Sequence, residues 1–356
     1  MKKVLLVATV YRQGERIYPI IPELSNHVEL DCLCVHQMGK GQEWNGNVDM
    51  RELFHNRYDK YFNSVSWDFK SILNNISDYD AIIFDDSRDK GTEIPTKIIY
   101  PIAKEHGITV FGNQHGNAKF SDRSYEVDHY KKVFDYCFLF GQYTKNFFSN
   151  YVDESAFLLG GIPSNDALKF YERTDEYILV ITNFLENERR VFPMFFGNEM
   201  VQKTRLADLQ QKYGKKVLVK IKSRDRHFAL GNPYENDLNF VQTVLKNNSV
   251  EGSVLRDVDD DNLLISQAHS VIASPSTMSF KPIQMGIPTV ILKGSGHTSA
   301  YKNFYGLTSY EGTEEKIDGQ LENGRDTEFI EHYLTGGVDY NATEIYINTL
   351  LNTIGK

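Results

Sequence analysis

Short, almost continuously apolar runs alternate with longer polar stretches along this chain, and the whole alternation occurs twice. Apolar runs of this length predict strands that are covered on both faces, as in a parallel sheet. In the first half, the runs lie at 3–10, 28–35, 80–86, 108–113 and 136–141. In the second half, they lie at 176–184, 215–223, 252–258, 270–275 and 288–294. A repeated strand-then-helix order is typical of doubly wound sheets, so the sequence predicts two successive α/β sheets.

The chain of 356 residues is longer than most single cores, which also favours two domains. A segment at 160–176, punctuated by Gly-Gly and Pro, predicts the junction. We expect a Rossmann-like N-terminal domain at 1–170, a Rossmann-like C-terminal domain at 171–335, and a helix at 336–356 that packs back toward the first domain. Facing sheets of this kind place the carboxyl ends of both strand sets at one central cleft, where open α/β folds bind ligands.

Composition narrows the class of protein further. Hydrophobic residues make up 41% of the chain, which is ample for packed cores, and the net charge of −9 argues against sequence-independent binding to nucleic acid. Three cysteines form neither a disulfide framework nor a metal-binding pair. No apolar run approaches the roughly 20 residues of a membrane span. We therefore expect a cytoplasmic protein without a transmembrane segment, and peripheral attachment at the inner membrane stays open.

A serine-rich turn begins at Ser274, at the end of the strand predicted at 270–275, and leads into a helix. Backbone N–H groups and hydroxyls at such a position can bind a phosphate group. The alternative is that these hydroxyls only cap the helix. The candidate phosphate-binding residues of the turn are Ser274, Ser276, Thr277 and Ser279.

Basic residues lie at and just past the end of the strand predicted at 215–223. Because Arg can bind phosphate oxygens with two hydrogen bonds, Arg224 and Arg226 are the preferred phosphate ligands here. A solvated basic loop is the alternative. The full set of candidates in this loop is Lys222, Arg224, Arg226 and His227.

His115 lies in a glycine-flanked turn directly after the strand predicted at 108–113. Its imidazole can accept a proton near neutral pH, which makes it the candidate general base, although a lone histidine is often structural. Asn113, Gln114 and Asn117 are candidate contacts to an acceptor. Asp86, at the end of the strand predicted at 80–86, is a further candidate on the acceptor side or simply a loop charge.

The acidic run at 256–262 contains Asp257 and Asp259 in a DxD arrangement, which can hold a divalent metal. Because the run directly precedes a predicted helix, its carboxylates are better interpreted as helix caps. No Walker A, GxGxxG, GxSxG or HExxH motif occurs. The sequence therefore predicts neither a bound metal nor a cofactor.

The segment AHSVIASPSTMSFKPIQMGIPTVIL (268–292) resembles the donor-phosphate segment of GT-B-fold glycosyltransferases. Together with the basic loop, the His115 turn and FLLGGIPSNDAL (157–168), it resembles the CDP-glycerol glycerophosphotransferase and bacterial surface-polysaccharide transferase group. The resemblance implies a GT-B-type fold with an N-terminal acceptor domain and a C-terminal nucleotide-donor domain. Asp166 of the last motif is better interpreted as a charge at a helix N-terminus than as a catalytic group.

The resemblance implies a transferase that moves a glycosyl or polyol-phosphate group from a nucleotide-activated donor to a hydroxyl acceptor. The reaction would be inverting and metal-independent, with His115 as general base and a glycan or lipid-linked acceptor. A nucleic acid acceptor is less favoured but stays open. Lys281 stands where relatives often carry an acid. The alternatives are a nucleotide-sugar 2-epimerase on the same architecture, against which Lys281 counts, and a noncatalytic binding protein.

Overall fold

The computed structural model describes most of the chain, in segments that cover both predicted sheets. The described residues are 1–8, 15–35, 54–85, 93–114, 134–150, 153–182, 205–221, 234–255, 258, 260–274, 276–292, 305–307 and 312–355. They form two compact units. The first unit comprises 1–118, 122–166 and 327–356, and the second comprises 119–121 and 167–326.

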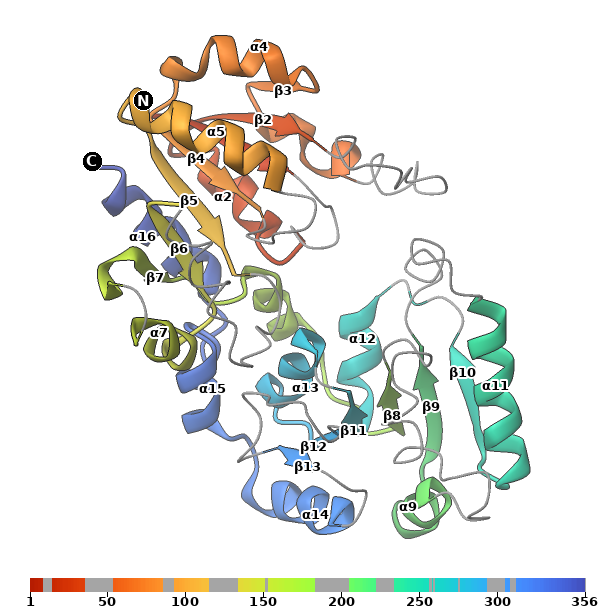
Figure 1. The fold of residues 1–356 in the computed structure, drawn as a ribbon. Helices are drawn as coiled ribbons and strands as arrows, with labels where there is room; N and C mark the ends of the chain where they lie inside the picture. Colours follow the sequence, from red (N-terminus) through yellow and green to blue (C-terminus); the bar gives the residue numbers. More distant parts are fainter. Residues whose placement is uncertain are drawn as a thin grey trace. The chain divides into compact units, whose positions relative to one another are not determined.

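The first unit is built on a parallel sheet with the strand order β3-β2-β1-β4-β5-β6-β7 among the described residues (Figure 1). Its strands are β1 Lys3–Ala8, β2 Glu29–Cys34, β3 Ser64–Ser66, β4 Ala81–Phe84, β5 Thr109–Asn113, β6 Tyr136–Leu139 and β7 Phe157–Leu159. From β1 the chain first builds outward to β2 and β3, and it then returns to add β4 on the other side. The strand order therefore reverses between β1 and β4.

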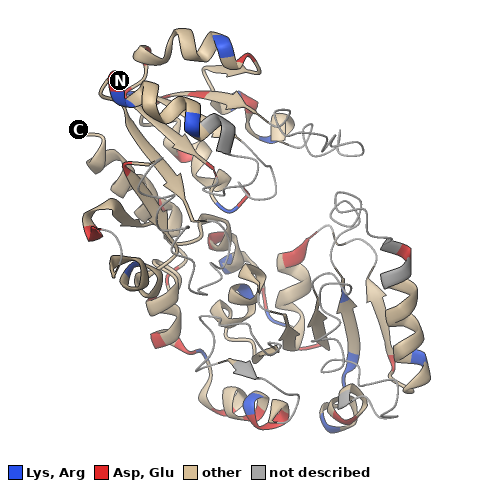
Figure 2. Cartoon of the chain, viewed as in Figure 1, with Lys and Arg blue, Asp and Glu red and all other residues tan. Residues whose placement is uncertain are grey.

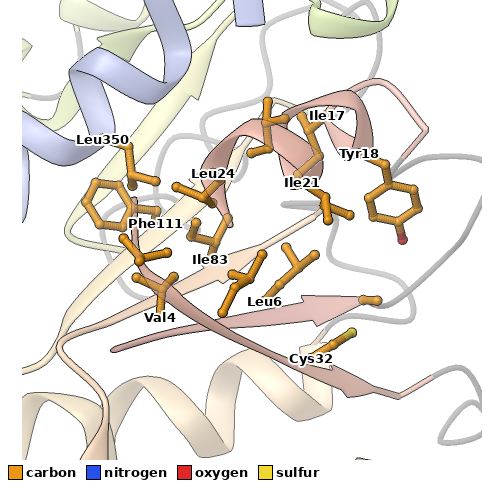
Figure 3. Close-up of a cluster of buried hydrophobic side chains, with 14 of the residues drawn as sticks. Val4, Leu6, Ile17, Tyr18, Ile21, Leu24, Cys32, Ile83, Phe111 and Leu350 are labelled. Carbon is orange, nitrogen blue, oxygen red and sulfur yellow. The ribbon is translucent and has the colours of Figure 1, made fainter. Parts of the chain in front are cut away.

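Helices cover both faces of this sheet because its central strands are apolar on both sides. One face packs against α2 Ile21–Leu24 and α16 Ala342–Thr353, with Val4, Leu6, Ile83 and Phe111 from the strands meeting Leu24 and Leu350 (Figure 3). The other face packs against α4 Phe69–Asn74, α5 Glu93–Glu105 and α7 Gln142–Ser149. Short 3-10 helices occur at Tyr18–Ile20, Asp59–Tyr61, Ile76–Asp78, Glu154–Ala156 and Pro163–Phe170.

The second unit repeats this plan with the strand order β10-β9-β8-β11-β12-β13. Its strands are β8 Tyr177–Ile181, β9 Lys216–Lys220, β10 Gly252–Leu255, β11 Ala268–Ala273, β12 Thr289–Leu292 and β13 Gly306–Leu307. One face packs against α9 Arg205–Tyr213, α11 Tyr234–Asn247 and α14 Thr313–Asn323. The other face packs against α12 Asp261–Ser266 and against Met278 and Met285, which flank α13 Phe280–Gln284. All described strand pairs are parallel, which confirms the prediction of two Rossmann-like sheets.

Residues 327–335 belong to the first unit, whereas the sequence placed them in the C-terminal domain. The reason is their packing: α15 Thr327–Tyr333 lies against α7, where the Tyr333 and Tyr143 rings stack at 4.5 Å, and Thr335 N donates a hydrogen bond to the Phe140 carbonyl at 2.8 Å. Gly161 permits this approach, because a Cβ at this left-handed position would collide with the Thr335 carbonyl.

The carboxylate of Asp166 attaches the next helix to the same unit. It accepts hydrogen bonds from Ala342 N at 3.0 Å and Thr343 N at 2.7 Å, and so caps the start of α16. Asp166 is thus a helix-terminal charge, as expected, although the helix that it caps lies far away in sequence. None of the helices within the described segments is long and apolar enough to cross a membrane.

Candidate functional site

The strand order of the second sheet reverses between β8 and β11, and ligands of open α/β sheets bind outside the carboxyl ends of strands at such a reversal. Thr182 directly follows β8, and Ser274 directly follows β11. Ser274 N donates a hydrogen bond to the Ile181 carbonyl at 3.0 Å, which joins the two strand ends. This carboxyl edge is the candidate phosphate-binding site of the second unit.

Two hydroxyls of the serine turn stabilise the turn itself. Ser276 Oγ accepts a hydrogen bond from Met278 N at 3.2 Å and caps the short 3-10 helix Thr277–Ser279. Ser279 Oγ donates to the Ser274 carbonyl at 3.2 Å, and both of these serines are buried. The capping interpretation is therefore confirmed for Ser276, while phosphate binding by the turn stays a prediction. Thr277, half-buried, makes no side-chain hydrogen bond within the described part of the chain.

The acidic run before α12 caps that helix, as the sequence indicates. Asp260 accepts hydrogen bonds from Asn262 N at 2.9 Å and Leu263 N at 3.0 Å, and from the Tyr171 hydroxyl at 2.7 Å. Burial acts to raise the pKa of Asp260, but these hydrogen bonds outweigh burial and the pKa is lowered. Asp257 and Asp259 lie outside the described residues. Within those residues, no group of three or more His, Cys, Asp or Glu side chains could hold a metal ion.

The two described lysines near this edge both contact α12. Lys220, at the carboxyl end of β9, forms an ion pair of 3.3 Å with Asp261 at the acidic start of α12 (Figure 2). Lys281 Nζ donates to Asn262 Oδ1 at 2.7 Å and so connects α13 with α12. The predicted cations Lys222, Arg224, Arg226 and His227 lie outside the described residues, and their contact with phosphate stays a prediction.

The first sheet carries a buried carboxylate at its own reversal. Asp85 directly follows β4, and its backbone N–H donates to the Val7 carbonyl of β1 at 3.2 Å. The hydroxyl of Tyr18 donates to Asp85 Oδ2 at 2.7 Å. Burial, followed by the charge of Asp85, raises the pKa of Tyr18 well above its usual value, so Tyr18 stays protonated as the donor. Asp86, next in sequence, lies outside the described residues.

Asn113 and Gln114 are buried and connect neighbouring strand ends. Asn113 Nδ2 donates to the Phe84 carbonyl at 2.8 Å, and Asn113 Oδ1 accepts from the Tyr346 hydroxyl of α16 at 3.0 Å. Gln114 Oε1 accepts from Phe140 N at 2.8 Å. These bonds give both side chains a structural function, and their contact with an acceptor stays a prediction. His115 and Asn117 lie outside the described residues.

Sequence reasoning missed two residues at these edges. Thr182 was included in a strand predicted at 176–184, although β8 ends at Ile181 and leaves Thr182 as its first polar successor. Tyr18 follows no strand, and no local pattern indicates that its hydroxyl reaches Asp85. Thr182 could have been found from the sequence, because the apolar run YILVI changes there to Thr-Asn. Tyr18 could not, because its contact with Asp85 joins segments that are distant in sequence.

No protein-family model matches this chain, and no curated protein matches it. Solved structures do match it from end to end. The UDP-GlcNAc 2-epimerase from Neisseria meningitidis, bound to UDP-GlcNAc, has a TM-score of 0.63 at 15% identity and covers 98% of this chain and 100% of its own. The UDP-GlcNAc 2-epimerase from Methanocaldococcus jannaschii has a TM-score of 0.61 at 13% identity with full coverage of both chains.

An Anabaena protein solved in complex with UDP and glucose also covers both chains fully, with a TM-score of 0.56 at 10% identity. These likenesses confirm the GT-B-type fold. They give no support to the CDP-glycerol glycerophosphotransferase group. They also contradict the transferase prediction, since epimerases from several organisms recur among the matching structures, and they favour the 2-epimerase alternative.

Proposed function

We propose that this chain is a nucleotide-sugar 2-epimerase that inverts C2 of a UDP-linked N-acetylhexosamine. The observation that carries the proposal is the match to UDP-GlcNAc 2-epimerases over 98% and 100% of the chain. The match runs through both units, so it spans both strand-order reversals. One of the matching epimerases is bound to UDP-GlcNAc, which supports a nucleotide sugar as the ligand.

Inversion at C2 removes the C2 proton from one face of the ring and returns a proton to the opposite face, so the site needs groups that accept and return a proton. Because C2 lies next to no carbonyl group, the electron pair of the broken C2–H bond forms a C1–C2 double bond as the bond from C1 to the UDP oxygen breaks, and both bonds are remade when UDP adds back. Asp85 is the described carboxylate at the reversal of the first sheet, and Tyr18 fixes one of its oxygens through the 2.7 Å hydrogen bond. We assign Asp85 to proton transfer or to orienting the sugar. Asp86 and His115, which follow β4 and β5 in sequence, are the further candidates for proton transfer.

The nucleotide binds, in this proposal, at the reversal of the second sheet. The Thr277 hydroxyl can donate to a phosphate oxygen, and Arg224 or Arg226 can balance the charge of a diphosphate. The ion pair between Lys220 and Asp261 and the bond between Lys281 and Asn262 hold the neighbouring helices in place. The reaction requires no acceptor, which separates it from group transfer.

The test is to incubate the purified full chain with UDP-GlcNAc in D₂O, with no acceptor present, and to follow the sugar by ¹H NMR. We expect the C2 epimer, UDP-N-acetylmannosamine, to accumulate and deuterium to appear at C2. Asp85→Asn, which keeps the size of the side chain, should slow conversion by at least about 100-fold. Unchanged UDP-GlcNAc, or release of UDP only when a hydroxyl acceptor is added, would refute the epimerase proposal.

A further inference from the structure

Thr182 is the first residue after β8, at the strand-order reversal of the second sheet. Its side chain is buried, with 5% of the residue exposed. The backbone N–H of Thr182 donates to the Lys220 carbonyl at 3.0 Å, which fixes the residue between β8 and β9. Its hydroxyl oxygen, by contrast, has no hydrogen-bond partner among the described residues.

The face on which this hydroxyl lies follows from strand alternation. Ile178 and Val180 of β8 pack in the cluster beneath α9 and α11, and Thr182, two residues further on, lies on the same face. On β11, Ile272 packs in that cluster and Ser274 follows by the same alternation. Thr182 and Ser274 therefore occupy equivalent places on adjoining strand ends, on one face of the reversal.

A buried hydroxyl without a partner is costly, because it has lost its hydrogen bonds to water. Valine has nearly the same shape and would occupy this position at no such cost, so the threonine calls for an explanation. Its place at the reversal supplies one, since this is where open α/β sheets bind ligands. We infer that the Thr182 hydroxyl forms a hydrogen bond with a nucleoside diphosphate bound at this edge. The inference rests on the proposed function and adds a binding residue to the same site.

The test compares three variants of the full chain by isothermal titration calorimetry with UDP and by thermal melting without ligand. Thr182→Val removes only the hydroxyl, and Thr182→Ser retains it. Ser270→Ala is the matched control, because the Ser270 hydroxyl is also buried without a partner among the described residues. Ser270 lies within β11, four residues before Ser274, which places it about 13 Å from the carboxyl edge of the sheet.

We expect Thr182→Val to weaken UDP binding about tenfold, the usual effect of losing one hydrogen bond to a charged group. Thr182→Ser should keep most of the affinity, and Ser270→Ala should leave it unchanged. The ligand-free melting temperature of Thr182→Val should equal or exceed that of the unaltered chain, because the change relieves an unpaired buried hydroxyl.

Undiminished UDP affinity in Thr182→Val would overturn the inference. So would a lower ligand-free melting temperature in that variant, which would give the hydroxyl a structural role, or an equal loss of affinity in Ser270→Ala. Failure of the unaltered chain to bind UDP is a different result, because it would refute the proposed function itself.

Discussion

Replacing Tyr346 with phenylalanine tests how the edge of the first sheet is held. The hydroxyl of Tyr346 donates to Asn113 Oδ1 at 3.0 Å, while the Tyr346 ring stacks on Phe138 at 3.8 Å. Phenylalanine keeps the stacking and removes only the donor, so Asn113 Oδ1 is left buried without this partner. An unpaired buried acceptor of this kind costs about 1–3 kcal/mol. We expect the free energy of unfolding to fall by about 1.5 kcal/mol.

The assay is thermal melting followed by circular dichroism. A domain of about 150–250 residues loses about 2–4 °C for each kcal/mol, so Tyr346→Phe should lower the melting temperature by about 3–6 °C. Tyr61→Phe is the control: Tyr61 belongs to the same cluster but is only half-buried, and its hydroxyl makes no hydrogen bond within the described residues. In an Asn113→Ala background, Tyr346→Phe should cost clearly less. An equal cost in both backgrounds would refute the assigned hydrogen bond.

Two further outcomes are expected from the structure. Asp166→Ala removes the hydrogen-bond acceptor for the first amides of α16, so the free energy of unfolding should fall by about 1 kcal/mol and these amides should exchange hydrogen faster. The control Asp153→Ala removes the cap of a short 3-10 helix and should leave hydrogen exchange in α16 unchanged. Burial lowers the pKa of His269, so the unfolded chain binds more protons than the folded chain between about pH 6.5 and that lowered pKa. The free energy of unfolding should therefore fall as the pH is lowered through this window, by at most about 1.4 kcal/mol per pH unit. Urea titrations at several pH values should show that the free energy of unfolding of His269→Gln depends less steeply on pH.

The sheets could be predicted because their strands are apolar on both faces. The run at 28–35 contains all of β2, and the run at 270–275 contains the last four residues of β11, because covered strands favour such apolar residues. The edge strands β3, β7 and β13 are not among the predicted runs. β3 and β7 have only three residues each, Ser64–Ser66 and Phe157–Leu159, and β13 has only the two residues Gly306–Leu307, so these strands are too short to show any periodicity. Their pairing depends on the neighbouring strand.

The site was harder to predict than the fold, because hydroxyls and amides at strand ends have two uses. Ser276 and Asn113 both follow or end strands where a ligand is expected, yet Ser276 caps a helix turn and Asn113 connects Phe84 with Tyr346. A sequence shows that a polar group is present at an edge. It does not show which partner the group contacts, because that depends on segments distant in sequence, such as α16.

The position of Lys281 bears on the choice between transferase and epimerase. In the sequence, this lysine counts against an epimerase, because it stands where relatives often carry an acid. In the structure its ammonium group donates to Asn262 and connects α13 with α12, while Asp260 caps α12 at its start. The lysine therefore has a structural role that explains its presence without reference to either reaction. With that objection removed, the two functions differ in whether an acceptor is needed, and the acceptor-free reaction in D₂O decides between them.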